Sequence, residues 1–392
     1  MTEKLGPLAK AALLGAALHV CLGLYSMGIV LPQVAHAFAG TSNAALLSQL
    51  IGGVTGLSFA VASPFAGRLI DRMGSARIYF WSSVLFAVAG TSVIFLNNLY
   101  FILLTRVLVG ASVAGALVAA ITGIGLLPAR EQAKLLGVFT LVGGILALTF
   151  YYVVAQLSEF GWRAPFALHL LGIAMLPLIL CLPRHRPAGA QFDIGAAALA
   201  KYRAIPPIPL LTISLFMGMA GVLPGLFAPF YLAGIGIHNP SQIMVPLMVT
   251  ALAVMPVSAS YGWLQHRLGI NGVFAASLIF TAGGSALSAF SSTLVELSGA
   301  LAVMGLGLGV SAANLSAAAV ASEPASPGRM IGIVNGVYYG AQALLPFVAL
   351  AIGNTFGASG VFKAFAIVSL VWGLNYAAIA FRGRGAAALR DA

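Results

Sequence analysis

Residues 67–77 read Gly-Arg-Leu-Ile-Asp-Arg-Met-Gly-Ser-Ala-Arg and place three arginines and one aspartate between two long apolar stretches. Charge is scarce elsewhere, because only 7% of the 392 residues are charged while 60% are hydrophobic. A charge cluster of this kind is stable where water reaches it, so the sequence predicts a loop at a membrane surface. The skeleton returns 195 positions later, where residues 262–269 read Gly-Trp-Leu-Gln-His-Arg-Leu-Gly. The chain is therefore predicted to contain two copies of one unit.

The composition indicates an integral membrane protein, because soluble domains carry roughly 25% charged residues. A membrane-spanning helix needs about 20 apolar residues, and polar breaks divide this chain into twelve such segments. Long unbroken segments exclude a β-barrel, whose strands alternate in polarity, and the first run is too long for a secretory signal, so we expect a retained helix. The predicted spans are approximately 9–35, 44–66, 77–96, 99–126, 134–157, 164–183, 207–233, 242–264, 271–290, 293–319, 330–352 and 360–381.

The distribution of basic residues predicts the orientation of these spans. Of 19 Lys and Arg residues, all but Arg106, Arg163 and Lys363 fall in the amino terminus, the carboxyl tail or the loops after even-numbered spans. The positive-inside rule then places both termini in the cytoplasm. The net charge of +11 is explained by contact with anionic lipid headgroups, so no nucleic-acid partner is expected. Cys21 and Cys181 both fall in predicted helices and indicate neither a disulfide nor a metal site.

The pattern Gly-x-Leu-x-Asp-Arg-x-Gly over residues 67–74 resembles the cytoplasmic loop signature of the major facilitator superfamily. Arg106 followed by Gly110 in the fourth span, and the turn at residues 161–163, resemble the same family. The resemblance implies an all-α membrane protein of twelve transmembrane helices in two pseudo-symmetric six-helix bundles, 1–183 and 207–392, joined by a cytoplasmic linker at 184–206. It also implies a conformational role for Gly67, Arg68, Asp71, Arg72, Gly74, Arg77 and Arg267.

Candidate substrate and coupling residues lie inside the predicted spans of the amino half. His19, Ser26 and Gln33 are spaced by seven, which places them on one face of a regular helix; the alternative is hydrogen bonding to a neighbouring helix. Arg106 is a charged residue in an apolar span, so it needs a polar partner or water. The resemblance implies that it takes part in proton transfer. The alternative is that its side chain extends to the membrane interface. We expect Arg106 and His19 to form the polar centre of this half, with Tyr151 nearby in the fifth span.

Candidate residues of the carboxyl half follow a helical spacing in the eleventh span. Asn335, Tyr338 or Tyr339, and Gln342 share one face, and Asn314 of the tenth span is expected to line the same cavity. The alternative is a tyrosine belt at the membrane interface.

The chemistry of the chain favours a transporter over an enzyme. The eight acidic residues all lie outside the deep part of the predicted helices, and no phosphate-binding glycine loop is present. We therefore expect neither cofactor nor metal, and a transport process driven by a gradient. The first reading is alternating-access, proton-coupled efflux of small amphipathic or anionic organic compounds. Proton-linked uptake of an organic anion is the alternative, and a polytopic membrane enzyme or sensor is the third class. The expected partners are a small-molecule substrate, protons and membrane lipids, for a monomer in a bacterial inner membrane.

Overall fold

The computed structural model describes residues 5–125, 127, 129–183, 207–323 and 327–388, and all secondary structure within these ranges is helical. The chain divides into two compact units. Unit 1 comprises Met1–Asp193, His238–Met244 and Tyr339–Pro346, and unit 2 comprises Ile194–Ile237, Val245–Tyr338 and Phe347–Ala392. Two short segments from beyond the predicted linker therefore cluster with the amino-terminal unit.

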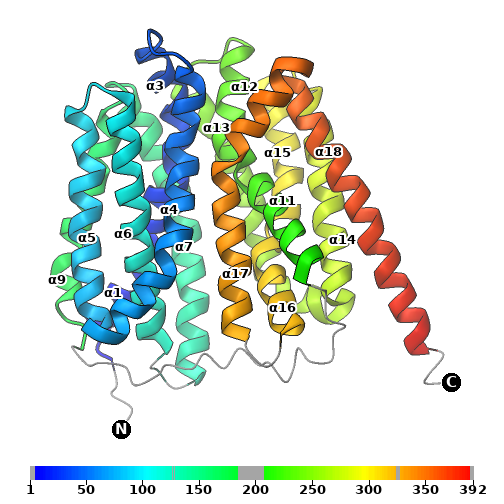
Figure 1. Cartoon of the computed structure of the whole chain (residues 1–392), viewed down its shortest axis with the longest axis horizontal. Helices are drawn as coiled ribbons and strands as arrows, with labels where there is room; N and C mark the ends of the chain where they lie inside the picture. The colour runs from blue at the N-terminus through cyan, green and yellow to red at the C-terminus, as the bar shows by residue number, and fades with distance from the viewer. Residues whose placement is uncertain (1–4, 126, 128, 184–206, 324–326, 389–392) are drawn as a thin grey trace. The chain divides into compact units, whose positions relative to one another are not determined.

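Unit 1 contains the helices of the first half of the sequence (Figure 1). They are α1 (Pro7–Leu14), α2 (Ala16–Val20), the π-helix η1 (Cys21–Tyr25), the 3-10 helix η2 (Ser26–Val30), α3 (Leu31–Ala37), α4 (Ala44–Met73), α5 (Ser75–Thr91), η3 (Ser92–Phe95), α6 (Leu99–Gly125), α7 (Ala129–Ser158), η4 (Ala164–Leu170), α8 (Leu171–Ala174) and α9 (Leu176–Ile179). The short helix η5 (Ala341–Ala343) also belongs to this unit and packs on α4.

Unit 2 holds most of the second half. Its helices are α11 (Pro207–Leu226), α12 (Ala228–Gly234), most of α13 (Pro240–Ala259), α14 (Tyr261–Ala289), α15 (Leu294–Leu308), α16 (Ser311–Ser322), nearly all of α17 (Pro327–Gly340) and most of α18 (Leu345–Ala388). The break between α11 and α12 at Phe227 lies between Pro224 and Pro229, as expected from prolines that cannot donate to the helical ladder.

Among the described residues, ten helices are long and apolar enough to cross a membrane, and a shorter apolar helix covers Ala164–Ile179. Both α14 and α18 contain a sharp backbone turn, at Gly269 (φ 70°) and Gly357 (φ 71°), which divides each into two arms. Figure 1 shows the chain reversing direction at the second of these turns. The count of twelve spans stays a prediction, whereas the all-helical membrane architecture is confirmed.

The predicted loop at 67–77 is wrong in its extent. Helix α4 continues to Met73 and α5 begins at Ser75, so the turn is reduced to Gly74, with φ 88° and ψ 148°. An α-helix satisfies its own backbone hydrogen bonds, so it can leave the apolar layer and carry charged side chains into water without ending. The charged residues at 68–72 therefore indicate where α4 leaves the apolar layer of the membrane. Gly74 indicates where the helix itself ends. Gly269, 195 positions later, makes the corresponding turn in unit 2.

The repeat extends from sequence to packing. A Cβ added to Gly110 of α6 would lie 2.3 Å from the carbonyl oxygen of Thr55 in α4, and one added to Gly305 of α15 would lie 2.8 Å from that of Thr250 in α13. Both pairs are related by the same offset of 195. Each threonine hydroxyl also donates to the carbonyl four residues earlier in its helix. Both units therefore use a glycine to bring two long helices into close backbone contact.

The two ends of unit 1 are marked by polar contacts between helices. Lys10, near the start of α1, pairs with Glu131, near the start of α7, at 2.9 Å. Arg163 follows the other end of α7 and donates to the carbonyl of Leu96 (3.1 Å) and the side-chain oxygen of Asn97 (2.7 Å). Arg163 is one of the three basic residues that the sequence places outside the predicted cytoplasmic segments. The structure gives it hydrogen-bond acceptors at the end of unit 1 opposite to Lys10.

Candidate functional site

Arg106 lies in α6 with its side chain 1% exposed, among the largest buried side chains of the protein. Its Nη2 donates to the carbonyl oxygens of Ala89 (3.5 Å) and Gly90 (3.4 Å) near the end of α5. Thr105 Oγ1 lies 3.4 Å away, and the guanidinium sits 5.2 Å from the centre of the Phe166 ring. Within the described residues it contacts no carboxylate. The charge is therefore held by dipoles and an aromatic face, and snorkelling does not describe this position.

His169 of η4 is the histidine beside this arginine. Its Nε2 lies 3.5 Å from Arg106 Nη1, and its Nδ1 lies 3.0 Å from the carbonyl oxygen of Phe166. A carbonyl only accepts, so the short contact assigns the ring proton to Nδ1 and leaves Nε2 as the acceptor for the guanidinium. A Cβ on Gly90 would lie 2.1 Å from the His169 ring, so the glycine makes room for it. The two side chains form an ordered donor and acceptor pair.

His19 of α2 lies in the same core but does not contact Arg106. Its Nε2 is 3.0 Å from Ser83 Oγ in α5, and both residues are fully buried. The Phe86 ring stands between the two histidines, with centroid distances of 4.7 Å to His19 and 4.8 Å to His169. The predicted role of Arg106 and His19 as a polar centre stays a prediction. The structure places both in a larger buried group, which we call the Arg106 cluster: His19, Ser83, Phe86, Arg106 and His169.

The other candidates of the first span do not converge with His19. Ser26 donates to the carbonyl of Cys21 in its own helix (2.8 Å), and Gln33 Nε2 reaches the carbonyl of Ser158 at the end of α7 (3.5 Å). The π-helix and 3-10 helix between residues 21 and 30 change the rotation per residue, so a spacing of seven no longer keeps one face. Tyr151 is half-buried on α7.

Asn314, which the sequence predicts to line a cavity, has hydrogen-bond partners for both polar atoms of its side chain. It is fully buried in unit 2, where its amide donates to the carbonyl of Ile270 (3.0 Å) and its oxygen accepts from the Tyr261 hydroxyl (3.3 Å). These contacts brace the two arms of α14 on either side of Gly269. Both polar ends of the amide therefore serve the turn, and the cavity role of Asn314 stays a prediction.

The candidates of α17 separate along the helix. Asn335 and Tyr338 are half-buried in unit 2, and a Cβ on Gly221 of α11 would lie 2.7 Å from the Tyr338 hydroxyl. Tyr339 and Gln342 cluster with unit 1, where the Tyr339 ring stacks edge-on against Phe59 of α4 at 4.7 Å. Gln342 is 2% exposed, and a Cβ on Gly56 would lie 2.4 Å from its oxygen.

The turn motif, residues 67–77 and its repeat at 262–269, presents arginines on the surface of both units. Arg68 lies over the Phe65 ring (5.7 Å) and Arg267 over the Trp263 ring (5.4 Å), and both are exposed, as are Arg72 and Arg77. Gly67 is an ordinary helical position with open space around it. The side chain of Asp71 lies outside the described part of the structure, so its conformational role stays a prediction.

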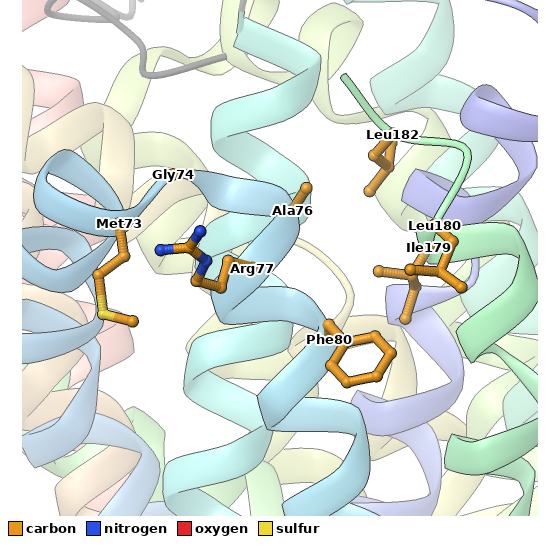
Figure 2. A pocket seen from close by; sticks show the side chains of 8 residues that line it. All are labelled: Met73, Gly74, Ala76, Arg77, Phe80, Ile179, Leu180 and Leu182. Carbon is orange, nitrogen blue, oxygen red and sulfur yellow. The ribbon is translucent and has the colours of Figure 1, made fainter. Parts of the chain in front are cut away.

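Two pockets lined by described residues lie outside the Arg106 cluster. The first, of about 210 Å³, is in unit 1 beside the Gly74 turn (Figure 2), and its walls are Met73, Gly74, Ala76, Arg77, Phe80, Ile179, Leu180 and Leu182. The second, of about 350 Å³, is an apolar groove of unit 2 between the end of α13, both arms of α14, and α15. Sequence reasoning missed the first pocket because residues 179–182 carry no polar signal. It also missed Ser83 and Phe86, which are ordinary residues of an apolar helix.

Comparisons with known proteins give one consistent result. Residues 13–272 match the sequence model of the Major Facilitator Superfamily. The chain is 23% identical over 375 residues to the riboflavin transporter RibZ of Clostridioides difficile (strain 630), covering 78% of this chain and 80% of RibZ. It is 24% identical over 247 residues to the sialic acid transporter NanX of Escherichia coli (strain K12), covering 59% of each chain. The crystal structure of the peptide transporter POT superposes with a TM-score of 0.76 at 13% identity, over 95% of this chain and 94% of that chain.

Proposed function

The chain belongs to the Major Facilitator Superfamily, and from that premise we propose that it is a secondary active transporter that moves a small organic solute by alternating access and couples this movement to protons. The family and the relatives are transporters, which supports solute movement as the activity. The observation that carries the proton coupling is the buried Arg106 and His169 pair, with no carboxylate in contact among the described residues.

The pair supports coupling because its two members respond differently to pH. Arginine keeps its charge at any working pH, whereas histidine is the side chain whose charge changes most readily near neutrality. A proton added to His169 Nε2 removes the acceptor that faces Arg106 and puts two cations 3.5 Å apart. At an effective dielectric constant of about 20, this repulsion amounts to about 5 kcal/mol. Protonation would therefore drive η4 away from α6, and deprotonation would restore their contact.

The charge balance of the unit supports an anionic or neutral amphipathic substrate. Arg106 is a fixed positive charge, and an anionic group of the substrate would compensate it once the cluster opens. With the guanidinium 1% exposed, the present arrangement supports a coupling role for Arg106 more directly than a binding role. The relatives named for riboflavin and for sialic acid support a small organic solute and provide the first two compounds to test.

We propose efflux in exchange for protons as the direction, with proton-linked uptake of an organic anion as the alternative. The test is flux in proteoliposomes that contain the purified full chain, loaded with radiolabelled riboflavin or sialic acid. Efflux should accelerate when the outside is made acidic and should lose this acceleration when an ionophore removes the pH gradient. Accumulation from an acidic exterior would favour the uptake alternative, and solute flux that ignores the gradient would overturn the proton coupling.

A further inference from the structure

The pocket beside Gly74 in unit 1 combines one cation with an otherwise apolar wall (Figure 2). Arg77 supplies the charge from the first turn of α5, and Phe80 lies one turn further along the same helix. Ile179, Leu180 and Leu182 close the pocket from the end of α9 and the residues after it. The figure shows these three side chains across from Phe80, with Arg77 and Met73 further to the left in this view.

The lining selects a ligand with two chemical parts. A soluble polar molecule would need several polar partners, and this pocket offers a single guanidinium side chain. A free phosphate would use the guanidinium but gain nothing from the apolar wall. An amphiphile with an anionic head and a hydrocarbon chain uses both. We propose that this pocket binds an anionic phospholipid of the bilayer, with its phosphate on Arg77 and an acyl chain against Phe80 and Ile179.

The surroundings of the pocket favour a lipid that arrives from the membrane. Arg68 and Arg72 are exposed at the same turn, so the field there is positive over more than one residue. Leu180 of the lining is 57% exposed, and Trp81, next to Phe80 in the chain, is 59% exposed, which is typical of side chains that face acyl chains. Trp81 packs edge-on against Phe80 with ring centroids 5.5 Å apart. A chain in the pocket would therefore continue along the outer face of α5.

The pocket is built on a packed base. Ile78 and Tyr79 of α5 and Ile179 and Leu182 belong to one hydrophobic core cluster, and the Tyr79 hydroxyl donates to the carbonyl of Ala12 in α1 at 2.9 Å. The wall that carries Phe80 is thus fixed against α1 and α9. A preformed site loses less conformational entropy on binding than a flexible surface does.

Trp81 provides a direct measurement of occupancy. The full chain, with Trp162, Trp263 and Trp372 each replaced by Phe, is placed one molecule per nanodisc in phosphatidylcholine. Trp81 fluorescence is then titrated with brominated phosphatidylglycerol or brominated phosphatidylcholine, whose bromines quench indole on contact. We expect phosphatidylglycerol to reach half-maximal quenching at an about fivefold lower mole fraction, the factor expected from one basic residue at an anionic surface.

Three variants distinguish a site from diffuse surface charge. Arg77→Gln should remove the preference for phosphatidylglycerol, and Ala76→Phe should reduce it by filling the pocket without changing the charge. Arg68→Gln removes an equal charge from the same turn but from outside the pocket, and should leave the preference intact. Equal quenching by the two lipids in the parent protein, or equal losses in Arg68→Gln and Arg77→Gln, would overturn the proposal. Displacement of the brominated lipid by inorganic phosphate would show an anion site instead of a lipid site and would also overturn it.

Discussion

Arg106 illustrates how a permanent charge is accommodated at the scale of one residue. The carbonyls of Ala89 and Gly90 and the ring nitrogen of His169 surround the guanidinium at 3.4–3.5 Å. These are long hydrogen bonds, so the arginine is held by several weak acceptors instead of one strong ion pair. An arrangement of this kind costs little to rearrange, which suits a group that changes partners during transport.

The first prediction concerns His169. His169→Gln keeps an acceptor for Arg106 but cannot take up a proton, so the fold should persist while transport loses its dependence on pH. Coupling of flux to the pH gradient should fall by a factor of about 5 to 150, the usual range of coupling between sites. Flux in proteoliposomes, measured with and without a pH gradient, is the measurement.

The matched control for this variant is His36→Gln, which changes an exposed histidine at the end of α3. It should keep the parent pH profile. A second variant, Arg106→Ala, should abolish coupled transport because it removes the group that senses the proton on His169. A parent-like profile in His169→Gln would show that this histidine is a structural acceptor only.

Residue roles were the hardest part to predict from the sequence. The polarity of His19 and Arg106 indicated a buried polar centre, because polar groups in an apolar helix must find partners. Which histidine faces the arginine depends on how η4 packs on α5 and α6, and a 3-10 segment has no signature in this sequence. The hydrogen bonds of Asn314 could not be predicted for a related reason: an amide that lines a cavity and an amide that braces a turn look the same before the neighbouring backbone is known.

At the scale of elements, the glycines of the turn motif divide into two kinds. Gly74 adopts φ 88° and ψ 148°, which side chains rarely tolerate, whereas Gly67 is helical and has open space where a Cβ would stand. The motif therefore contains one glycine required by backbone geometry and one that its surroundings do not require.

A second prediction follows for these positions. Gly74→Ala should destabilise the protein by about 1–3 kcal/mol because the alanine would sit in a strained region of backbone space. Gly67→Ala should be neutral or stabilising by up to about 1 kcal/mol, since alanine favours the helix. Thermal unfolding of the purified variants in detergent measures both. Equal melting temperatures for the two variants would contradict the assignment, and Gly269→Ala should behave like Gly74→Ala.

The third prediction concerns the close helix contacts. Gly110→Ala would press a methyl group against the Thr55 carbonyl, a backbone atom that cannot move alone, and should cost about 1–3 kcal/mol. Gly305→Ala should destabilise less, because its contact with the Thr250 carbonyl is longer. Gly137→Ala on α7, where nothing lies within 4 Å, is the control and should melt like the parent. A parent-like melting temperature for Gly110→Ala would show that α4 and α6 separate at little cost.

The elements themselves were largely predictable because the bilayer leaves few choices for the backbone. Apolar length fixed most spans, and the repeat of residues 67–74 at 262–269 correctly placed the equivalent turns at Gly74 and Gly269. The prediction of a loop at 67–77 was wrong because the first charged residue was taken as the end of the helix. The helix in fact continues past the charged residues at 68–72 to Met73. Irregular segments such as η1 and η2 were missed because neither interrupts the apolar run. The missing N–H of Pro32 removes one bond from the helical ladder near η2.

At the scale of the whole molecule, the charge asymmetry predicts a fixed orientation. In a chain with Cys21→Ala and Cys181→Ala, single cysteines at Asn98 and Arg72 lie beyond opposite ends of α5 and are exposed. A membrane-impermeant thiol reagent added to intact cells should label Asn98→Cys, whereas Arg72→Cys and Gln191→Cys should react only after the membrane is opened. Labelling of Arg72→Cys and Asn98→Cys from the same side would refute the predicted topology.

The placement of Arg106 also bears on how the protein is made. Its carbonyl acceptors lie 16 and 17 residues earlier in the chain, but His169 lies 63 residues later. At a synthesis rate of about 5–20 residues per second, the histidine emerges roughly 3–13 s after the arginine. During that interval α6 must enter the membrane with the carbonyls at the end of α5 as hydrogen-bond acceptors for Arg106. The insertion of an arginine at the centre of a membrane helix costs about 2.5–3.5 kcal/mol. A substitution that loosens the end of α5 should therefore reduce how much protein is inserted before it has any effect on transport.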